Sequence, residues 1–133
     1  RDNRRLLGEY SRDRNVLNTF SYTGGFSVYA AAAGAANVVS VDVSKPAIDL
    51  CYRNIALNHL QNHEGIVADT FEYLKDKKDQ FDVIVLDPPA FAKSRDSKHN
   101  AMIGYKRLNA LAIKQVKKAG ILFTFSCSGT QNL

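Results

Sequence analysis

The sequence has no long apolar run, few cysteines and no secretory leader pattern. Among its 133 residues no apolar run approaches 18, which excludes a membrane-spanning segment. The two cysteines, Cys51 and Cys127, lie far apart and fit no metal-ligand spacing, so no metal site is predicted. We therefore expect free thiols in a reducing compartment, a cytoplasmic location and no membrane partner.

The dinucleotide-binding fingerprint G-x-G-x-x-G is also absent, which disfavours an NAD-dependent dehydrogenase. The chain has no internal repeat and no low-complexity linker, and it does not begin with methionine, so we expect a piece of a longer polypeptide. With 18 lysines and arginines against 13 acidic residues, the net charge is +5. That charge fits a polyanionic partner such as RNA and equally an ordinary basic domain.

Strand-like and helix-like segments alternate along the chain. Nearly continuous runs of Val, Ile, Leu and Phe predict strands covered on both faces, at Val16–Phe20, Val38–Asp42, Ile66–Ala68, Phe81–Leu86 and Ile121–Ser126. Helices are predicted between them, at Asn3–Tyr10, in the Ala-rich segment that ends at Gly34, after Ser44, after Asp69 and at Tyr105–Lys118. This order predicts an α/β fold with a doubly wound, mostly parallel sheet.

The helix after Ser44 has the clearest local signals. Ser44 can cap it, and Pro46 falls in its first turn. Ile48, Cys51 and Ile55 share one face at spacings of three and four residues. Cys51 is therefore predicted to be a structural residue of the core.

The longest irregular segment is predicted at Pro88–Gly104, and its part from 92 to 103 is basic. Loops of this length are uncommon in compact domains unless they are functional or mobile. The segment is interpreted either as a solvated surface loop or as a loop that contacts nucleic-acid backbone or closes over a substrate.

Polar, glycine or proline residues follow every predicted strand, and ligands bind outside the carboxyl ends of the strands in an open parallel sheet. Gly24 and Gly25 allow close approach of a ligand to the backbone, and the following helix offers N–H donors. Asp42, 18 residues beyond Gly24, can accept both hydroxyls of a ribose, and Asp69 can accept from an adenine amino group. Either aspartate alone is more often a helix cap, but together with the glycine loop they favour an adenosyl ligand.

The segment LDPPAF follows the fourth predicted strand. Pro88 and Pro89 remove N–H donors, which leaves the Asp87 carboxylate and nearby carbonyls as acceptors for a base with an exocyclic amine. Phe91 can stack on such a base, worth about 1–3 kcal/mol, or pack into the core.

Four segments, VLNTFSYTGGFSVYAA, VVSVDVS, FDVIVLDPPAF and GILFTFSCSG, together resemble a bacterial and archaeal family of class I S-adenosylmethionine-dependent methyltransferases. Its best-known type forms 5-methylcytosine in large-subunit ribosomal RNA. The resemblance implies a Rossmann-like fold, S-adenosyl-L-methionine as cofactor and ribosomal RNA as partner. It assigns residues 1–14 to the end of a connecting segment and the first helix, and 15–133 to a truncated catalytic domain. The last two strands and an RNA-binding domain would be missing, and the full-length protein could form a homodimer.

The resemblance also implies roles for single residues. The loop Phe20–Gly25 would hold the methionine end of the cofactor, Asp42 the ribose and Val43 the adenine. The implied cofactor-binding residues are Phe20, Ser21, Tyr22, Thr23, Gly24, Gly25, Asp42, Val43, Ser44, Asp69, Thr70 and Asp87. The implied substrate-binding residues are Pro88, Pro89, Phe91 and Lys93. Asn18 and Tyr22 stand where many class I methyltransferases have an acidic residue and a glycine.

Cys127 lies at the end of the last predicted strand, between two serines. The resemblance implies a nucleophile that adds to carbon six of cytosine and makes carbon five reactive. This role requires a thiolate, whereas a free cysteine has a pKa of about 8.5. A base must then remove the proton from carbon five, and Asp87, or a water that it holds, is the candidate for this second catalytic role.

Three hypotheses follow from the sequence. The first is methylation of carbon five of a cytosine in ribosomal RNA through a cysteine adduct. The second is methylation of a ring nitrogen or exocyclic amine of guanine or another base, which needs no thiol. The third is a non-catalytic module that binds a nucleotide or RNA.

Overall fold

The structure is a computed structural model that describes the backbone of residues 2–22, 24–88 and 95–124. Five strands form one sheet in the order β3-β2-β1-β4-β5, and every described pair is parallel. The strands are β1 (Asn15–Thr19), β2 (Asn37–Asp42), β3 (His63–Val67), β4 (Val83–Leu86) and β5 (Ile121–Thr124). The predicted α/β class and parallel sheet are confirmed.

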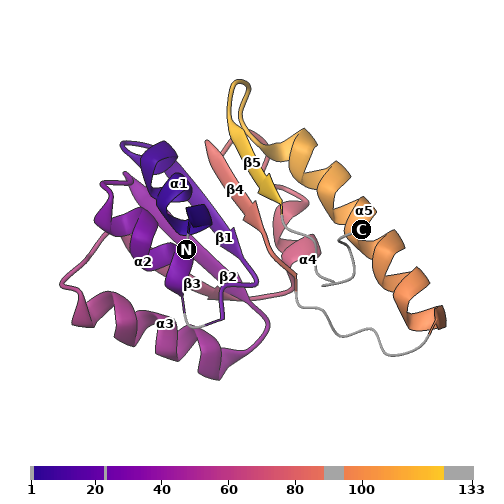
Figure 1. The fold of residues 1–133 in the computed structure, drawn as a ribbon, viewed down its shortest axis with the longest axis horizontal. Coiled ribbons are helices and arrows are strands. Elements are labelled where there is room, and N and C mark those ends of the chain that lie inside the picture. Colours follow the sequence, from indigo (N-terminus) through magenta and orange to yellow (C-terminus); the bar gives the residue numbers. More distant parts are fainter. Residues whose placement is uncertain (1, 23, 89–94, 125–133) are drawn as a thin grey trace.

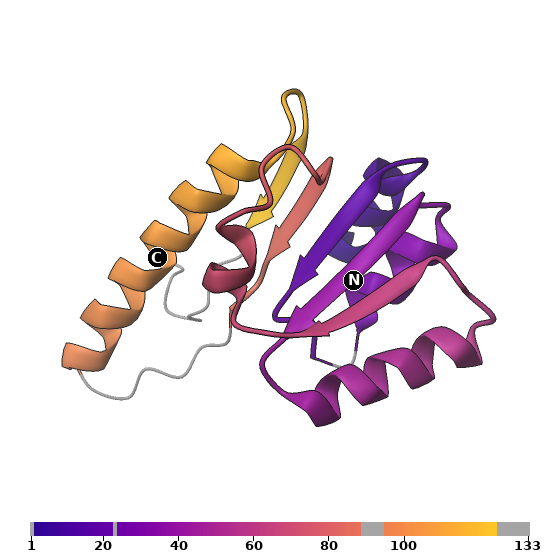
Figure 2. The same ribbon diagram turned by 180° about the vertical axis from the view of Figure 1, so that it is seen from behind.

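The helices cover both faces of the sheet (Figures 1 and 2). On one face lie α2 (Gly25–Ala32) and α3 (Lys45–Leu57), with α1 (Asp2–Ser11) packed against α2. On the other face lie α4 (Thr70–Leu74) and α5 (Arg95–Gln115). The strand order reverses between β1 and β4, which is the point where ligands bind in doubly wound sheets.

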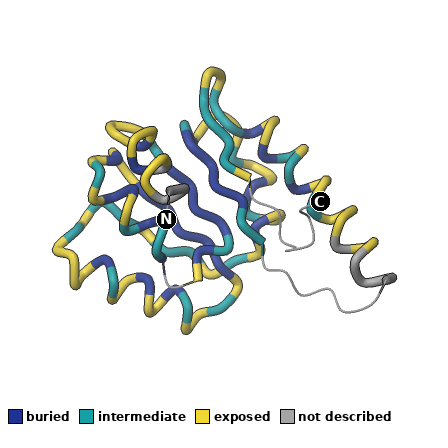
Figure 3. The backbone as a smooth tube through the Cα atoms, in the orientation of Figure 1, coloured by how far each residue is buried: buried dark blue, intermediate teal, exposed yellow. Residues whose placement is uncertain are grey.

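The core consists of two apolar layers separated by the sheet. Val16 and Val85 point toward α2 and α3, whereas their neighbours Leu17 and Ile84 point toward α4 and α5. All four side chains are fully buried. Figure 3 shows the buried residues concentrated along the central strands, as nearly continuous apolar runs predict.

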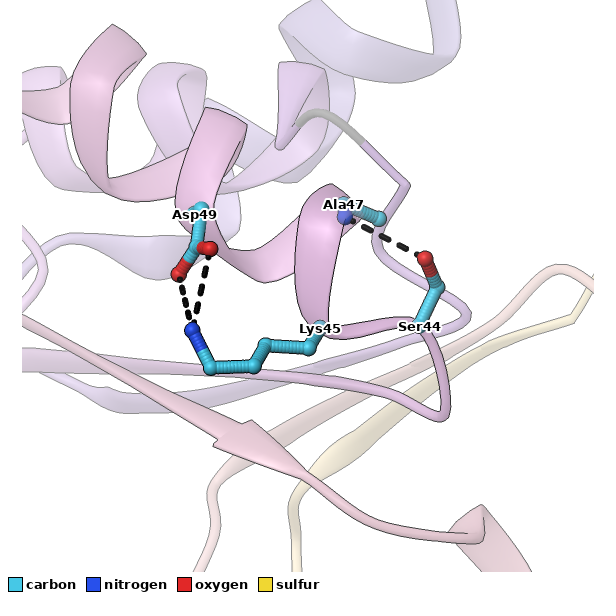
Figure 4. Close-up of polar contacts among 4 residues, drawn as sticks. All are labelled: Ser44, Lys45, Ala47 and Asp49. Carbon is cyan, nitrogen blue, oxygen red and sulfur yellow. Dashed lines mark hydrogen bonds and ion pairs between the residues drawn. The ribbon is translucent and has the colours of Figure 1, made fainter.

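Ser44 begins α3 as predicted. Its hydroxyl accepts the backbone N–H of Ala47 at 3.2 Å, and a proline occupies the first turn (Figure 4). Lys45 pairs with Asp49 at 3.1 Å on the exposed side of the same helix. The cap fixes the direction in which the chain leaves β2, directly after Asp42.

Three predicted boundaries differ from the structure by three residues or more, one of them being the end of α5 at Gln115 and not at Lys118. Residues 95–104 belong to α5 and not to the predicted Pro88–Gly104 loop. After Pro89 the chain has no further proline to break the helix, and Gly104 costs it only about 1 kcal/mol relative to alanine. The third strand begins at His63 instead of Ile66, because pairing with β2 outweighs the weak strand propensity of Glu64 and Gly65.

Candidate functional site

The predicted site residues that the structure describes come together at one edge of the sheet. Because all strands are parallel, the residues that follow β1, β2, β3 and β4 emerge at the same edge. Thr23, Pro89, Phe91, Lys93 and Cys127 lie outside the described residues, and their roles stay predictions.

The connection between β1 and α2 has an unusual backbone. Phe20 and Tyr22 adopt φ angles of 53° and 51°, and Gly24 adopts 88°. The left-handed conformation costs a non-glycine residue about 1–2 kcal/mol. Backbone bonds hold this shape, from Ser21 N–H to Val41 O at 3.1 Å and from Gly24 N–H to Ser21 O at 2.8 Å. Strain that is held in place in this way is typical of ligand-binding loops.

Asp42 ties this loop to the β2–α3 connection. One carboxylate oxygen accepts the backbone N–H of Tyr22 at 3.0 Å, and the other accepts that of Ser44 at 2.9 Å. The side chain is buried. Sequence reasoning missed this structural role, because it depends on the unusual loop backbone. Each oxygen retains a second lone pair, so the geometry also allows acceptance from ribose hydroxyls.

Two further carboxylates border the edge. Asp87 is half-buried, and burial raises the pKa of its carboxyl. Burial also raises the pKa of the Tyr22 hydroxyl, with smaller contributions from the negative charges of Asp87 and Asp42. The negative charges of Asp87, after β4, and Asp42, at the end of β2, therefore both influence the Tyr22 hydroxyl. A cationic group would be stabilised at this edge of the sheet by the same charges.

Asp69 caps α4 by accepting the N–H of Glu72 at 3.0 Å, and the next residue, Thr70, is buried.

Val43 is an apolar residue that is nevertheless 69% exposed. An exposed Val43 beside the loop leaves an apolar surface that a planar ligand could cover.

A chain of buried polar side chains runs beneath the loop, and sequence reasoning missed it. The Asn18 amide donates to the Ser27 hydroxyl at 2.9 Å, and Ser27 is hydrogen-bonded to Ser40. Ser40 in turn bonds Nε2 of His63 at 2.7 Å and accepts from the Cys51 thiol at 3.4 Å. The available signal was the position of Asn18 and Ser40 inside otherwise apolar strands.

Cys51 supports the loop from below. It is fully buried, and burial raises the pKa of its thiol, so it is a protonated structural residue as predicted. A Cβ placed on Gly24 would lie 2.4 Å from the Cys51 sulfur. The glycine thus allows the loop backbone to rest directly on α3.

His63 is expected to make stability depend on pH. Burial lowers the pKa of its ring to about 4, from 6.5 in the unfolded chain. Between these values the unfolded state binds more protons, so stability is present above pH 6.5 and is lost as the pH falls toward 4. Because the ring is only partly buried, we expect a loss of about 1–2 kcal/mol.

Urea unfolding of the wild type and of His63→Gln at pH 7 and pH 5 measures this effect. The variant should lose less stability than the wild type on acidification. His59→Gln is the matched control, since His59 is exposed after α3. Equal pH dependence of the wild type and His63→Gln would contradict the expectation.

A hollow of about 560 Å³ lies between α1 and α2, away from the strand ends. It contains none of the predicted site residues, and it is lined by Arg5, Gly8, Glu9, Arg12, Tyr29, Ala32 and Ala33. Neither its position nor its lining connects it with the candidate site.

Comparison with known proteins identifies the family. The sequence pattern described as S-adenosylmethionine-dependent methyltransferase matches residues 1–123. The chain belongs to this methyltransferase family. It is 46% identical over 134 aligned residues to ribosomal RNA large subunit methyltransferase I of Aeromonas salmonicida, which covers 97% of the chain and 34% of the relative. The corresponding protein of Pseudoalteromonas atlantica is 48% identical with the same coverage. The chain thus spans about a third of the length of these relatives.

Solved structures agree with the family assignment. The SMU.776 protein in complex with SAH superposes with a TM-score of 0.77 at 31% identity, over 98% of this chain and 36% of the other. A SAM-dependent methyltransferase from Agrobacterium tumefaciens gives a TM-score of 0.75 at 25% identity, over 96% and 45% of the two chains. The Rossmann-like methyltransferase fold and S-adenosylmethionine as the family cofactor are therefore confirmed.

The residues of this methyltransferase domain fit the cofactor. Asn18 Oδ1 and Ser21 Oγ are buried and have no hydrogen-bond partner among the described residues. Buried polar atoms usually have partners, so these two are available to a ligand or a water. The cofactor supplies an electrophilic methyl group on a positively charged sulfur, which suits the acidic surroundings formed by Asp42 and Asp87.

The double anchor at Asp42 gives a test of this fit. Asp42→Ala leaves two backbone N–H groups without their acceptor, which frees the strained loop. We expect the affinity of the full-length protein for S-adenosylmethionine to fall about 30- to 100-fold, corresponding to about 2–3 kcal/mol. Calorimetric titration measures it. Asp49→Ala, which removes an exposed carboxylate from α3, should bind like the wild type, and equal affinities of the two variants would refute the anchoring role.

Proposed function

We propose that the chain is the cofactor-binding part of an enzyme that methylates large-subunit ribosomal RNA. The observation that carries this proposal is the identity of 46–48% to relatives of that name, extending over 97% of the chain. The acidic strand-end site supports methyl transfer, and the net charge of +5 supports a nucleic-acid substrate. An RNA substrate in the ribosome would also agree with the cytoplasmic location expected from the sequence.

The proposed product is 5-methylcytosine, formed through Cys127. The Cys127 thiolate would add to carbon six of the base, and the electron pair displaced onto carbon five would form the new bond to the methyl carbon, while the bond from that carbon to the cofactor sulfur breaks and its electron pair returns to the sulfur. A base then removes the proton from carbon five, and re-formation of the double bond expels the thiolate. Asp87 is the candidate base, supported by the raised pKa of its carboxyl, which makes it a better proton acceptor than an exposed aspartate.

The proposed organisation follows the same assignment. Residues 1–14 would end a connecting segment and enter the domain, and 15–133 would form the cofactor-binding part. Parts of the full-length protein outside this chain would supply an RNA-binding domain and complete the sheet, and the assembled protein could be a homodimer.

A second candidate is methylation of a ring nitrogen or exocyclic amine without a thiol. Hydrogen-bond acceptors at the end of β4 support this candidate. The Asp87 carboxylate and the carbonyl groups before Pro88 lie there, and an amino group of a base could donate to them. In this case Cys127 would have no chemical role.

Mass-spectrometric mapping of ribosomal RNA tests the proposal. Cells that lack the full-length protein should lose one 5-methylcytosine from the large-subunit RNA, and the purified protein should restore it in the presence of S-adenosylmethionine. Loss of a methylated guanine would favour the second candidate. An unchanged set of modifications, together with no methylation in vitro, would contradict both and favour a non-catalytic binding module.

A further inference from the structure

The part of the chain that contains most of the last helix is rich in basic residues and contains no acidic residue after Asp96. All 13 acidic residues lie within the first 96 positions. From Ser97 to Leu133 the chain has no aspartate or glutamate and six strong cations, Lys98, Lys106, Arg107, Lys114, Lys117 and Lys118. Most of this segment of the described chain is the single helix α5.

Helix geometry places the cations on the outer surface. Leu108, Ala112 and Gln115 are buried against the sheet and α4. At about 100° per residue, Arg107 and Lys114 point away from that face, and both are exposed. Seven residues separate them, so they lie about 10 Å apart along the helix axis.

The flank that bears these cations is the one toward α4. Gln115 donates to the carbonyl groups of Leu74 at 2.6 Å and Lys75 at 3.0 Å, which fixes the rotation of α5 relative to α4. The opposite flank carries Met102 and Ile113, which are 56% and 62% exposed, and also Lys106, which lies one turn after Met102. Tyr105, bonded to Thr124 of β5, marks that other side. Arg107 and Lys114 therefore lie on a different flank from the exposed apolar residues.

Two lysines in the segment that follows α4 form ion pairs with acidic neighbours. Lys75 pairs with Glu72 and Lys77 with Asp76, both at 3.1 Å. Lys117, in the turn after α5, pairs with Asp82 at 3.5 Å. By contrast, Arg107, Lys114 and Lys118 are exposed and have no ion-pair partner among the described residues. We refer to these three residues as the basic stripe.

We propose that the basic stripe binds the phosphate backbone of the RNA substrate, beyond the nucleotide that enters the site. This inference rests on the proposed function. The helix begins after the end of β4, at the edge that holds the site, and its 21 residues run back along the side of the domain (Figures 1 and 2). Arg107 lies 12 residues, or about 18 Å, after the first residue of α5, so the stripe would contact RNA at about that distance from the edge.

Charge complementarity favours RNA over a protein partner. The cores of protein interfaces are depleted in lysine, whereas phosphate contacts use exposed lysine and arginine and need little shape complementarity. Acidic residues from earlier in the chain lie near the end of α5, such as Asp82 beside Lys117, but Arg107 and Lys114 form no ion pair among the described residues.

The test uses the full-length protein with the double variant Arg107→Gln/Lys114→Gln. The matched control is Arg14→Gln/Arg53→Gln, which removes the same charge from exposed positions that belong to other parts of the fold. Binding of a large-subunit RNA fragment is measured between 50 and 300 mM salt, alongside S-adenosylmethionine affinity and turnover at saturating RNA.

We expect the stripe variant to bind RNA about tenfold more weakly, with a salt dependence shallower by about two units of slope, while the control behaves like the wild type. Cofactor affinity and saturated turnover should be unchanged. RNA binding equal to the control would overturn the stripe proposal. Unchanged RNA binding with altered sedimentation would assign the face to a protein contact and overturn it equally. If the wild type neither bound nor methylated RNA, the proposed function itself would fail.

Discussion

Replacing Cys127 by alanine in the full-length enzyme is expected to abolish RNA methylation and to leave S-adenosylmethionine binding intact. Carbon five of cytosine is a weak nucleophile until a thiolate adds to carbon six, so the variant lacks the step that activates the substrate. Removal of such a nucleophile lowers turnover by at least about 1,000-fold. Cofactor affinity should stay within about twofold of the wild type, because the loop, Asp42 and Val43 are unchanged.

Methyl transfer from labelled cofactor and calorimetric titration provide the two readouts. RNA that contains a fluorinated cytosine at the target position gives a third, since fluorine in place of the carbon-five proton blocks the last step. The wild type should then form a covalent adduct that survives denaturation, and Cys127→Ala should form none. Full activity of Cys127→Ala would rule out the nucleophile and favour methylation of a nitrogen atom.

The sequence predicted the fold well because the decisive signals are local. Buried runs such as 83–86 and the cap at Ser44 depend only on nearby residues, and parallel pairing follows from their alternation with helices. The start of α5 could not be predicted in this way. Residues 95–104 contain polar residues and a glycine, which are typical of loops. The structure shows that they form the first turns of α5, ahead of the part of the helix that packs against the sheet.

The arrangement of the predicted site residues at one edge could be predicted, but their internal contacts could not. Parallel strands bring Asp42 and Asp87 to the same edge whatever the side chains do. The bonds from Tyr22 and Ser44 to Asp42 depend on two non-glycine residues in the left-handed region, which no local pattern indicates. The network that joins residues from five elements left only a weak signal in the sequence, the polar Asn18 and Ser40 inside apolar strands, and its partners cannot be read from local patterns.

Gly24→Ala is expected to weaken cofactor binding by about 30-fold, and removal of the Cys51 sulfur should partly restore it. Two effects act on the variant. The φ angle of 88° is unfavourable for alanine by about 1 kcal/mol, and the new methyl group would lie 2.4 Å from the Cys51 sulfur, so the loop must move. Since the same loop backbone would hold the cofactor, the displacement reduces affinity as well as stability.

A double-mutant cycle separates these two effects. Cys51→Ala removes the sulfur but leaves its Cβ, which would lie 3.2 Å from the new methyl group, so Gly24→Ala/Cys51→Ala should recover about five- to tenfold of the lost affinity. The loss of affinity that remains in the double variant measures the cost of the backbone conformation at position 24. Gly104→Ala is the control, because a Cβ added at this exposed helical glycine would meet nothing within 4 Å, and it should leave affinity unchanged while stabilising α5 slightly. If the two substitutions are additive, Cys51 does not support the loop, and the low tolerance at Gly24 comes from its backbone conformation alone.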